Sequence, residues 1–150
     1  MPIIIQIFKN NMTLQGTEIL KKNGLRLTNS RSAIINVFCT SNTAIGHAEL
    51  EDALIEDEFD RVTIYRTINT FLDKGIIHKV MDGSGVGKFA LCSAKCDEHQ
   101  HHDDHIHFNC LTCGTTTCME ELLVPQIKLP QGYEVKEANV LLKGICAKCQ

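Results

Sequence analysis

Apolar residues recur at helical spacing through the first half of the chain. The stretch 61–74 carries four of them at i, i+4, i+7 and i+8, on one face of a helix: Ile64, Ile68, Phe71 and Leu72. Three shorter helices are predicted over 14–23, from a cap at Thr28 to about residue 38, and over 47–58. Gly24, Gly46 and Gly75 stand at the boundaries between these helices.

After residue 75 the pattern changes to short strands. Residues 76–80 and 88–91 flank a glycine-rich turn and predict a β-hairpin. Helices followed by a hairpin predict a winged helix-turn-helix domain, which we place at 13–92. The polar stretch 93–104 predicts a hinge. Residues 105–150 predict a small second unit with a strand at 106–110, a helix over 120–129 that ends at Pro130, and one or two strands within 133–142. The predicted fold class is therefore α+β.

The composition supports a folded chain but gives an ambiguous charge signal. At 150 residues with 43% hydrophobic residues, the chain can bury a core and is not disordered. The net charge of −3 and the pI near 6.1 do not by themselves suggest nucleic-acid binding. However, the segment 49–60 is rich in acids, so that the rest of 1–91 is locally basic. A neutral chain can therefore still present a positive face to DNA.

Cysteine and histidine are the unusual components, with eight and seven copies respectively. Residues 1–11 are apolar but lack the features of a signal peptide, and we regard them as an uninformative extension. No run approaches the roughly 18 apolar residues that span a bilayer. We therefore expect a cytoplasmic protein without a membrane partner, in which thiols stay reduced and paired cysteines indicate metal binding.

Two CxxC motifs stand near opposite ends of the second unit. Each presents two thiolates from one turn, and four thiolates around one ion form a closed tetrahedral zinc site. The predicted structural Zn(II) ligands are Cys110, Cys113, Cys146 and Cys149. A thioredoxin-like redox pair is disfavoured because no βαβ pattern surrounds either motif. The ion would stabilise a unit of fewer than 60 residues, which is small for a domain without such a crosslink.

The face of helix 61–74 opposite its apolar stripe carries polar residues suited to DNA. Arginine can bind guanine edges or phosphate, and asparagine can bind adenine. With basic residues from neighbouring elements, the predicted DNA-binding set is Arg26, Arg31, Thr63, Tyr65, Arg66, Asn69 and Lys88. Five polar residues on one helix are equally compatible with a solvated face. Their place in the second helix of a helix-turn-helix favours DNA.

Taken together, these motifs resemble the ferric uptake regulator family of dimeric, metal-responsive bacterial repressors. The resemblance covers about residues 13–149. It rests on four segments: 20–28 with Arg31, then 62–68, 105–114 and 144–149. It implies a homodimer through residues 105–150, binding to palindromic double-stranded operator DNA, a structural four-cysteine zinc and a second, regulatory metal between the domains.

The resemblance also implies which residues hold the regulatory metal. His47 falls at a ligand position of the DNA-binding domain, His105 and His107 fall on strand ligands, and Cys118 replaces a carboxylate. The remaining ligand is left open between Cys92, Cys96 and His99. Because thiolate in place of carboxylate favours Zn(II) over Fe(II) or Mn(II), we expect a zinc-sensing regulator of metal-uptake or homeostasis genes.

Three alternatives bear on this expectation. An iron- or peroxide-sensing member of the same family is one, and a thiol redox-switch regulator that uses Cys92, Cys96 and Cys118 is another. A zinc hydrolase or deaminase is the third, but no H-x-E motif with P-C-x-x-C is present. We therefore expect no enzyme activity and no small-molecule substrate.

Overall fold

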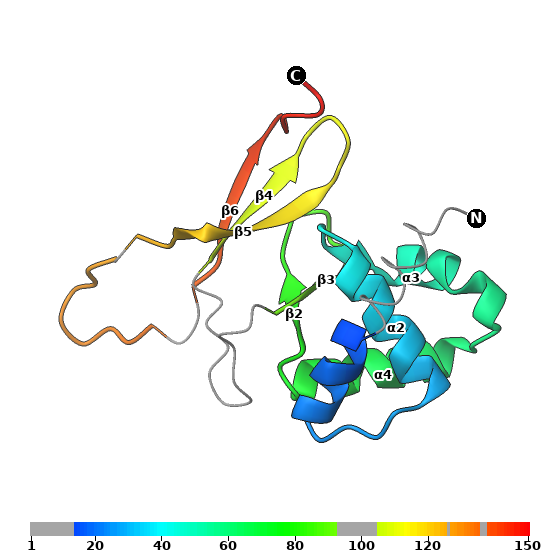
Figure 1. The fold of residues 1–150 in the computed structure, drawn as a ribbon. Helices are drawn as coiled ribbons and strands as arrows, with labels where there is room; N and C mark the ends of the chain where they lie inside the picture. The colour runs from blue at the N-terminus through cyan, green and yellow to red at the C-terminus, as the bar shows by residue number, and fades with distance from the viewer. Residues whose placement is uncertain (1–13, 93–104, 126, 136–137) are drawn as a thin grey trace.

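The computed structural model describes residues 14–92, 105–125, 127–135 and 138–150 (Figure 1). After a helical segment at 14–22 come α2 (Asn29–Thr40), β1 (Ile45–Gly46), α3 (His47–Ala53), the short 3-10 helix η1 (Ile55–Asp57) and α4 (Arg61–Asp73). The strands β2 (Ile77–Val80) and β3 (Lys88–Leu91) form the wing. Then follow β4 (His105–Cys110), β5 (Thr116–Leu123) and β6 (Val140–Gly144).

Local signals in the sequence set the helix boundaries. The Thr28 hydroxyl accepts a hydrogen bond from the backbone N–H of Arg31 and begins α2, while the Asp60 carboxylate accepts one of 2.7 Å from the N–H of Thr63 and begins α4. Gly75 follows α4 with a φ of 64°, a conformation that favours glycine. The helix predicted over 47–58 divides into α3 and η1.

The helices pack around one core that continues into the wing. Its buried members come from the α-helical segments and from strands β1–β3, and include Leu20, Ile34, Ile35, Phe38, Leu50, Ile64, Ile68, Phe71, Ile77 and Phe89. Burial of this apolar surface is the main force that holds the unit together. The predicted helices and hairpin are thereby confirmed as a helical unit with a wing, within an α+β chain.

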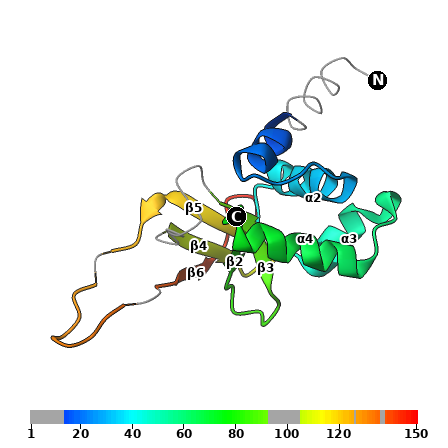
Figure 2. The ribbon, with the colours of Figure 1, turned by 90° about the horizontal axis from the view of Figure 1, so that it is seen from below.

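The wing sheet has the order β1-β3-β2, and its two faces differ in what they contact. Ile77 and Phe89 point into the helical core. Successive side chains of a strand alternate between faces, so His78 and Ala90, which lie opposite each other in register, belong to the other face. That face contacts the second sheet, so the wing lies between the helices and β4–β6 (Figure 2).

The second sheet has the order β5-β4-β6. β5 pairs antiparallel to β4, and β6 pairs parallel to it. The helix predicted over 120–129 is wrong, because β5 continues as a strand through residue 123. Its backbone groups pair with β4, and this tertiary pairing outweighs the helical preference of the residues around Glu121 and Leu122. Of the strands expected within 133–142, one forms, at Val140–Gly144.

Among the described helices, none combines the length and the apolar character needed to cross a bilayer.

Candidate metal centres and DNA interface

The four predicted zinc ligands come together at one end of the second sheet. The parallel register places Cys110 opposite Gly144, so that the turns after β4 and β6 emerge side by side. The N–H of Leu111 donates to the Gly144 carbonyl over 2.8 Å, which fixes the two turns to each other. As a result, the four Sγ atoms of Cys110, Cys113, Cys146 and Cys149 all lie within 4.8 Å of one another.

The electrostatics of this cluster suit a divalent cation. Backbone N–H groups of Cys113 and Cys146 stabilise the Cys110 thiolate and lower its pKa to about 6. By contrast, the neighbouring thiols of Cys146 and Cys113 raise the pKa of Cys149 to about 12. Four thiolates this close repel one another unless a cation compensates their charge. A tetrahedral Zn(II) is the ion that this set of four sulfur donors fits.

A second cluster of donor atoms lies between the wing and the second sheet. The Nε2 atoms of His78 and His107 are 3.4 Å apart, and Cys118 Sγ lies 3.6 Å from His78 Nε2. All three donor atoms lie within 4.8 Å of one another, with both imidazoles buried. Cys92 Sγ adds a fourth nearby donor, 3.5 Å from His78 Nδ1. Within the described residues, this group contains no carboxylate.

Strand geometry explains why these residues meet. His78 of β2 and Ala90 of β3 are opposite each other, and Cys92, two residues after Ala90, belongs to the same face of the hairpin. Across the interface, His107 of β4 pairs in register with Cys118 of β5. The cluster is therefore built from both units, and an ion bound there would link them. Nitrogen and sulfur donors of this kind suit Zn(II) better than Fe(II) or Mn(II).

Apart from His47, the regulatory ligands predicted from the sequence divide into two groups. His107, Cys118 and Cys92 lie at the cluster. Cys96, His99 and the side chain of His105 lie outside the described residues.

His47 does not lie at the cluster. Its ring stacks on Tyr65 at 5.9 Å between centroids and meets Phe89 edge-on at 5.4 Å. Because Phe89 points to the helical side of the wing and His78 to the opposite side, His47 is separated from the cluster by the hairpin itself. His47 thus contacts the proposed DNA-reading helix.

Sequence reasoning missed His78, which supplies the histidine of the DNA-binding unit. The sequence predicts His78 only as part of the wing strand 76–80. One signal was available: His78 lies two residues before Val80 and therefore on the same face of the strand, where a buried histidine is unusual. The contact with His107 depends on tertiary packing and could not be derived from spacing.

The DNA-reading face of α4 is available to a ligand. Tyr65 and Arg66 are exposed, and Asn69 is half-buried. The Thr63 hydroxyl is hydrogen-bonded to the Asp60 carboxylate at the start of the helix. Nearby, the Arg31 guanidinium donates to the carbonyl of Arg26 over 3.0 Å, which joins the two predicted phosphate-binding residues.

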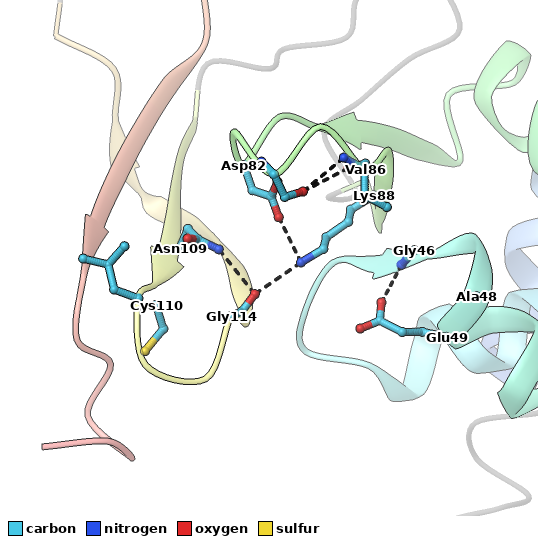
Figure 3. Close-up of a pocket in the computed structure, with 11 residues that line it drawn as sticks. Gly46, Ala48, Glu49, Asp82, Val86, Lys88, Asn109, Cys110 and Gly114 are labelled. Atoms are coloured by element: carbon cyan, nitrogen blue, oxygen red, sulfur yellow. Dashed lines mark hydrogen bonds and ion pairs between the residues drawn. The ribbon is translucent and has the colours of Figure 1, made fainter.

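Lys88, also predicted to bind DNA, is engaged elsewhere. Its ammonium lies 2.9 Å from the Asp82 carboxylate and donates to the Gly114 carbonyl over 3.2 Å (Figure 3). Only 15% of the Lys88 side chain and 1% of the Asp82 side chain are exposed. These residues line an interdomain pocket of about 440 Å³ that also reaches Cys110. Lys88 therefore binds the second unit rather than facing solvent.

With this geometry established, comparison with known proteins identifies the family. The family model described as "Ferric uptake regulator family" matches residues 22–145. The ferric uptake regulation protein of Staphylococcus aureus is 32% identical over 143 residues, covering 92% of this chain and 98% of that protein. This chain belongs to the ferric uptake regulator family.

Solved structures of ferric uptake regulator relatives share the fold. A zinc uptake regulator complexed with zinc and DNA has a TM-score of 0.64 at 23% identity, covering 93% of each chain. The Vibrio cholerae ferric uptake regulator has a TM-score of 0.57 at 23% identity, covering 86% of this chain and 98% of that one. Ferric uptake regulator proteins are transcription regulators rather than enzymes, so the helical unit and the metal clusters are interpreted in those terms.

Proposed function

We propose that this chain is a zinc-sensing transcriptional repressor that binds palindromic operator DNA as a homodimer and controls metal-uptake or homeostasis genes. The cluster of His78, His107 and Cys118 is the observation that carries the proposal, because it joins the DNA-binding unit to the second unit. Cys92 Sγ lies beside Nδ1 of His78, whereas His107 and Cys118 face Nε2, so Cys92 is placed to orient the ring as a hydrogen-bond partner. Cys96, His99 and His105 remain candidates for additional ligands.

The donor set supports Zn(II) as the sensed ion. Two imidazoles and one thiol, with no carboxylate among the described donors, match the borderline-soft character of Zn(II), whereas Fe(II) and Mn(II) sites are richer in oxygen donors. When bound, the ion supplies a bond between the two units and so restricts their relative orientation. The four-cysteine cluster holds a separate, structural Zn(II), the first zinc, that stabilises the sheet around β4 and β6.

The relative orientation of the two units matters because the proposed operator is read by two copies of α4. In a two-fold dimer, the angle between the units sets the distance between the two reading helices, and hence the half-site spacing. Exposed apolar side chains of the second unit support a homodimer through that unit: Leu122, Ile127, Leu129, Tyr133 and Val135. An ion that favours the DNA-competent arrangement must bind more tightly when operator is present.

The proposal is tested by metal-dependent operator binding. An operator is selected from a random duplex pool with zinc-loaded protein, and its affinity is then measured by fluorescence anisotropy at buffered free Zn(II), Fe(II) and Mn(II). Activation by trace buffered Zn(II) is expected. Activation by Fe(II) or Mn(II), without a response to Zn(II), would show that the sensed metal has been assigned incorrectly.

The second candidate function is a thiol redox switch at the same site. It is favoured by one observation: the Cys92 and Cys118 thiols both contact the His78 imidazole, with Cys92 Sγ 3.5 Å from Nδ1 and Cys118 Sγ 3.6 Å from Nε2. Peroxide would oxidise two thiols to a disulfide and be reduced to water. Thiol counting after peroxide treatment of the zinc-loaded protein separates the two functions, since a pure zinc sensor keeps these thiols reduced.

A further inference from the structure

The wing and the second sheet are joined by a polar contact that involves neither cysteines nor the histidine cluster. Asp82 follows β2 and is 3% exposed. Its carboxylate pairs with the Lys88 ammonium at 2.9 Å and accepts a hydrogen bond of 3.1 Å from the hydroxyl of Thr116 on β5. Thr116 is fully buried, so this hydrogen bond is made away from water.

Two further hydrogen bonds cross the interface at the same place. Lys88 Nζ donates to the carbonyl of Gly114, and the backbone N–H of Ala44 donates to the carbonyl of Thr116 over 2.8 Å. Figure 3 shows the Lys88 ammonium between the Asp82 carboxylate and Gly114, with the wing on one side and the β4–β5 turn on the other. Residues of three separate segments of the DNA-binding unit thus engage one short segment of the other unit.

The polar contact continues directly into the metal cluster. Thr116 and Cys118 are two residues apart on β5 and belong to one face, as do Val80 and His78 on β2. Between the two polar groups lies a small apolar contact in which Cys118 packs against Ala44, Val80 and Ala90. The interface therefore contains, in order along the strands, an ion pair, an apolar contact and the donor cluster.

We propose that Asp82, Lys88 and Thr116 form a latch that docks the two units in one preferred orientation before any regulatory metal binds, and that a metal bound at the donor cluster strengthens this docking. The latch acts as a positioning element, because it brings His78 into place opposite His107 and Cys118. A buried ion pair and its hydrogen bonds have strict geometric requirements, so they specify one relative orientation. The consequence for metal affinity rests on the proposed function, whereas the docking itself does not.

Docking is measured by hydrogen exchange at the Ala44 amide, whose hydrogen-bond partner is Thr116 of the other unit. The sample is the full chain with four-cysteine zinc retained and no added regulatory metal. The latch requires a strongly protected Ala44 amide in this sample. It further requires that the Ala44 amide exchanges at least tenfold faster in Asp82→Asn and in Thr116→Val than in the parent. The amide of the buried core residue Ile68 should exchange at the parent rate in both variants, which shows that they are folded. An unprotected Ala44 amide in the parent, or unchanged protection in both variants, overturns the latch.

A matched control is available one residue further along β5. Thr117 lies opposite Phe108 in the β4–β5 register and faces away from Asp82. Thr117→Val is therefore the same substitution as Thr116→Val, but it removes a hydroxyl that takes no part in the latch. Ala44 protection should remain at the parent value in this variant, and a loss as large as that of Thr116→Val would overturn the assignment to Thr116.

Zinc titration of the same samples connects the latch to the metal. Preorganisation predicts that Asp82→Asn weakens the non-cysteine zinc site about tenfold and leaves the four-cysteine site unchanged. If Ala44 protection falls but the affinity of the second site does not, the latch stands and its positioning of the metal ligands is overturned. If the parent binds no second zinc at all, the proposed metal site fails while the exchange result still decides the latch.

Discussion

The Nε2 atoms of His78 and His107 lie 3.4 Å apart, although one residue belongs to the wing and the other to the second sheet. In the proposed regulatory site, the ligand from the DNA-binding unit therefore comes from β2. The family resemblance had suggested His47 for that role, whose ring lies instead against Tyr65 and Phe89. The two assignments predict different metal stoichiometries.

His78→Ala should remove the second zinc and leave the first. A direct ligand is lost, so affinity should fall by more than the roughly 10–100-fold that loss of an outer-shell partner costs. His47→Ala should keep two zinc ions per chain, whatever its effect on DNA binding. Zinc is counted by atomic emission after dialysis against a weak chelator. Loss of the second ion in His47→Ala but not in His78→Ala would reverse the assignment.

The four-cysteine cluster predicts a structural rather than a regulatory defect. Cys113→Ser should release the first zinc and unfold the sheet that β4 and β6 share, because zinc binding and folding are coupled in such sites. Circular dichroism should show lost strand signal, and sedimentation should show monomers. Cys39→Ser is the control, since the half-buried Cys39 packs at the helical core, far from both clusters in the sequence. It should cost about 1 kcal/mol and retain both metals. Identical behaviour of the two variants would argue against a structural zinc at Cys113.

The latch gives stability a specific dependence on pH. Burial alone would raise the pKa of Asp82, but hydrogen bonds from Ser84, Lys88 and Thr116 outweigh it and hold the pKa well below the ordinary value. Lys88 is the cation paired with this carboxylate, and the ammonium of Lys143 lies beside the neighbouring Gly83. Since the folded pKa is depressed, Asp82 contributes stability above its unfolded pKa of about 3.9, and this contribution is lost as pH falls through the folded value.

Asp82→Asn should therefore reduce the free energy of unfolding by about 2 kcal/mol at pH 7. The gap between parent and variant should narrow steadily below about pH 4. Urea unfolding of both proteins across the pH range gives this difference in the free energy of unfolding. Zinc is lost from both proteins in acid, so its loss cancels in the difference. Asp57→Asn, at an exposed carboxylate of η1, should stay within about 0.5 kcal/mol of the parent. A gap that is constant down to pH 2 would contradict the depressed pKa.

Local signals predicted the parts of this molecule that local physics controls. The apolar spacing of Ile64, Ile68 and Phe71 and the cap at Asp60 are sufficient to define α4, and both are observed. The two CxxC motifs predicted that four thiols form one site, and the structure places these four thiols in one cluster. By contrast, residues 120–123 at the end of β5 fall in the predicted helix 120–129, because they form a strand only through the pairing of β5 with β4.

Tertiary packing also explains why the sequence predicted neither the cluster of His78, His107 and Cys118 nor the burial of Lys88. His78 meets His107 only after the wing docks on the second sheet, and Lys88 is withdrawn from solvent only because Asp82 and Gly114 are brought to it. The spacing of residues in the sequence predicts neither contact. Family resemblance supplied residue types for the regulatory site, but it could not show that the ring of His47 is occupied by aromatic contacts.

The two wing lysines provide the last prediction. Lys79 is exposed on β2, while the Lys88 ammonium is held by Asp82 and Gly114. A phosphate contact releases counterions, so a lysine that binds DNA contributes to the salt dependence of affinity. Lys79→Ala should lower the slope of log affinity against log salt by about 1, whereas Lys88→Ala should leave that slope unchanged. Lys88→Ala should instead speed exchange of the Ala44 amide, because it breaks the latch. Operator binding at several salt concentrations provides the measurement, and an equal loss of slope in both variants would mean that Lys88 leaves Asp82 to bind phosphate.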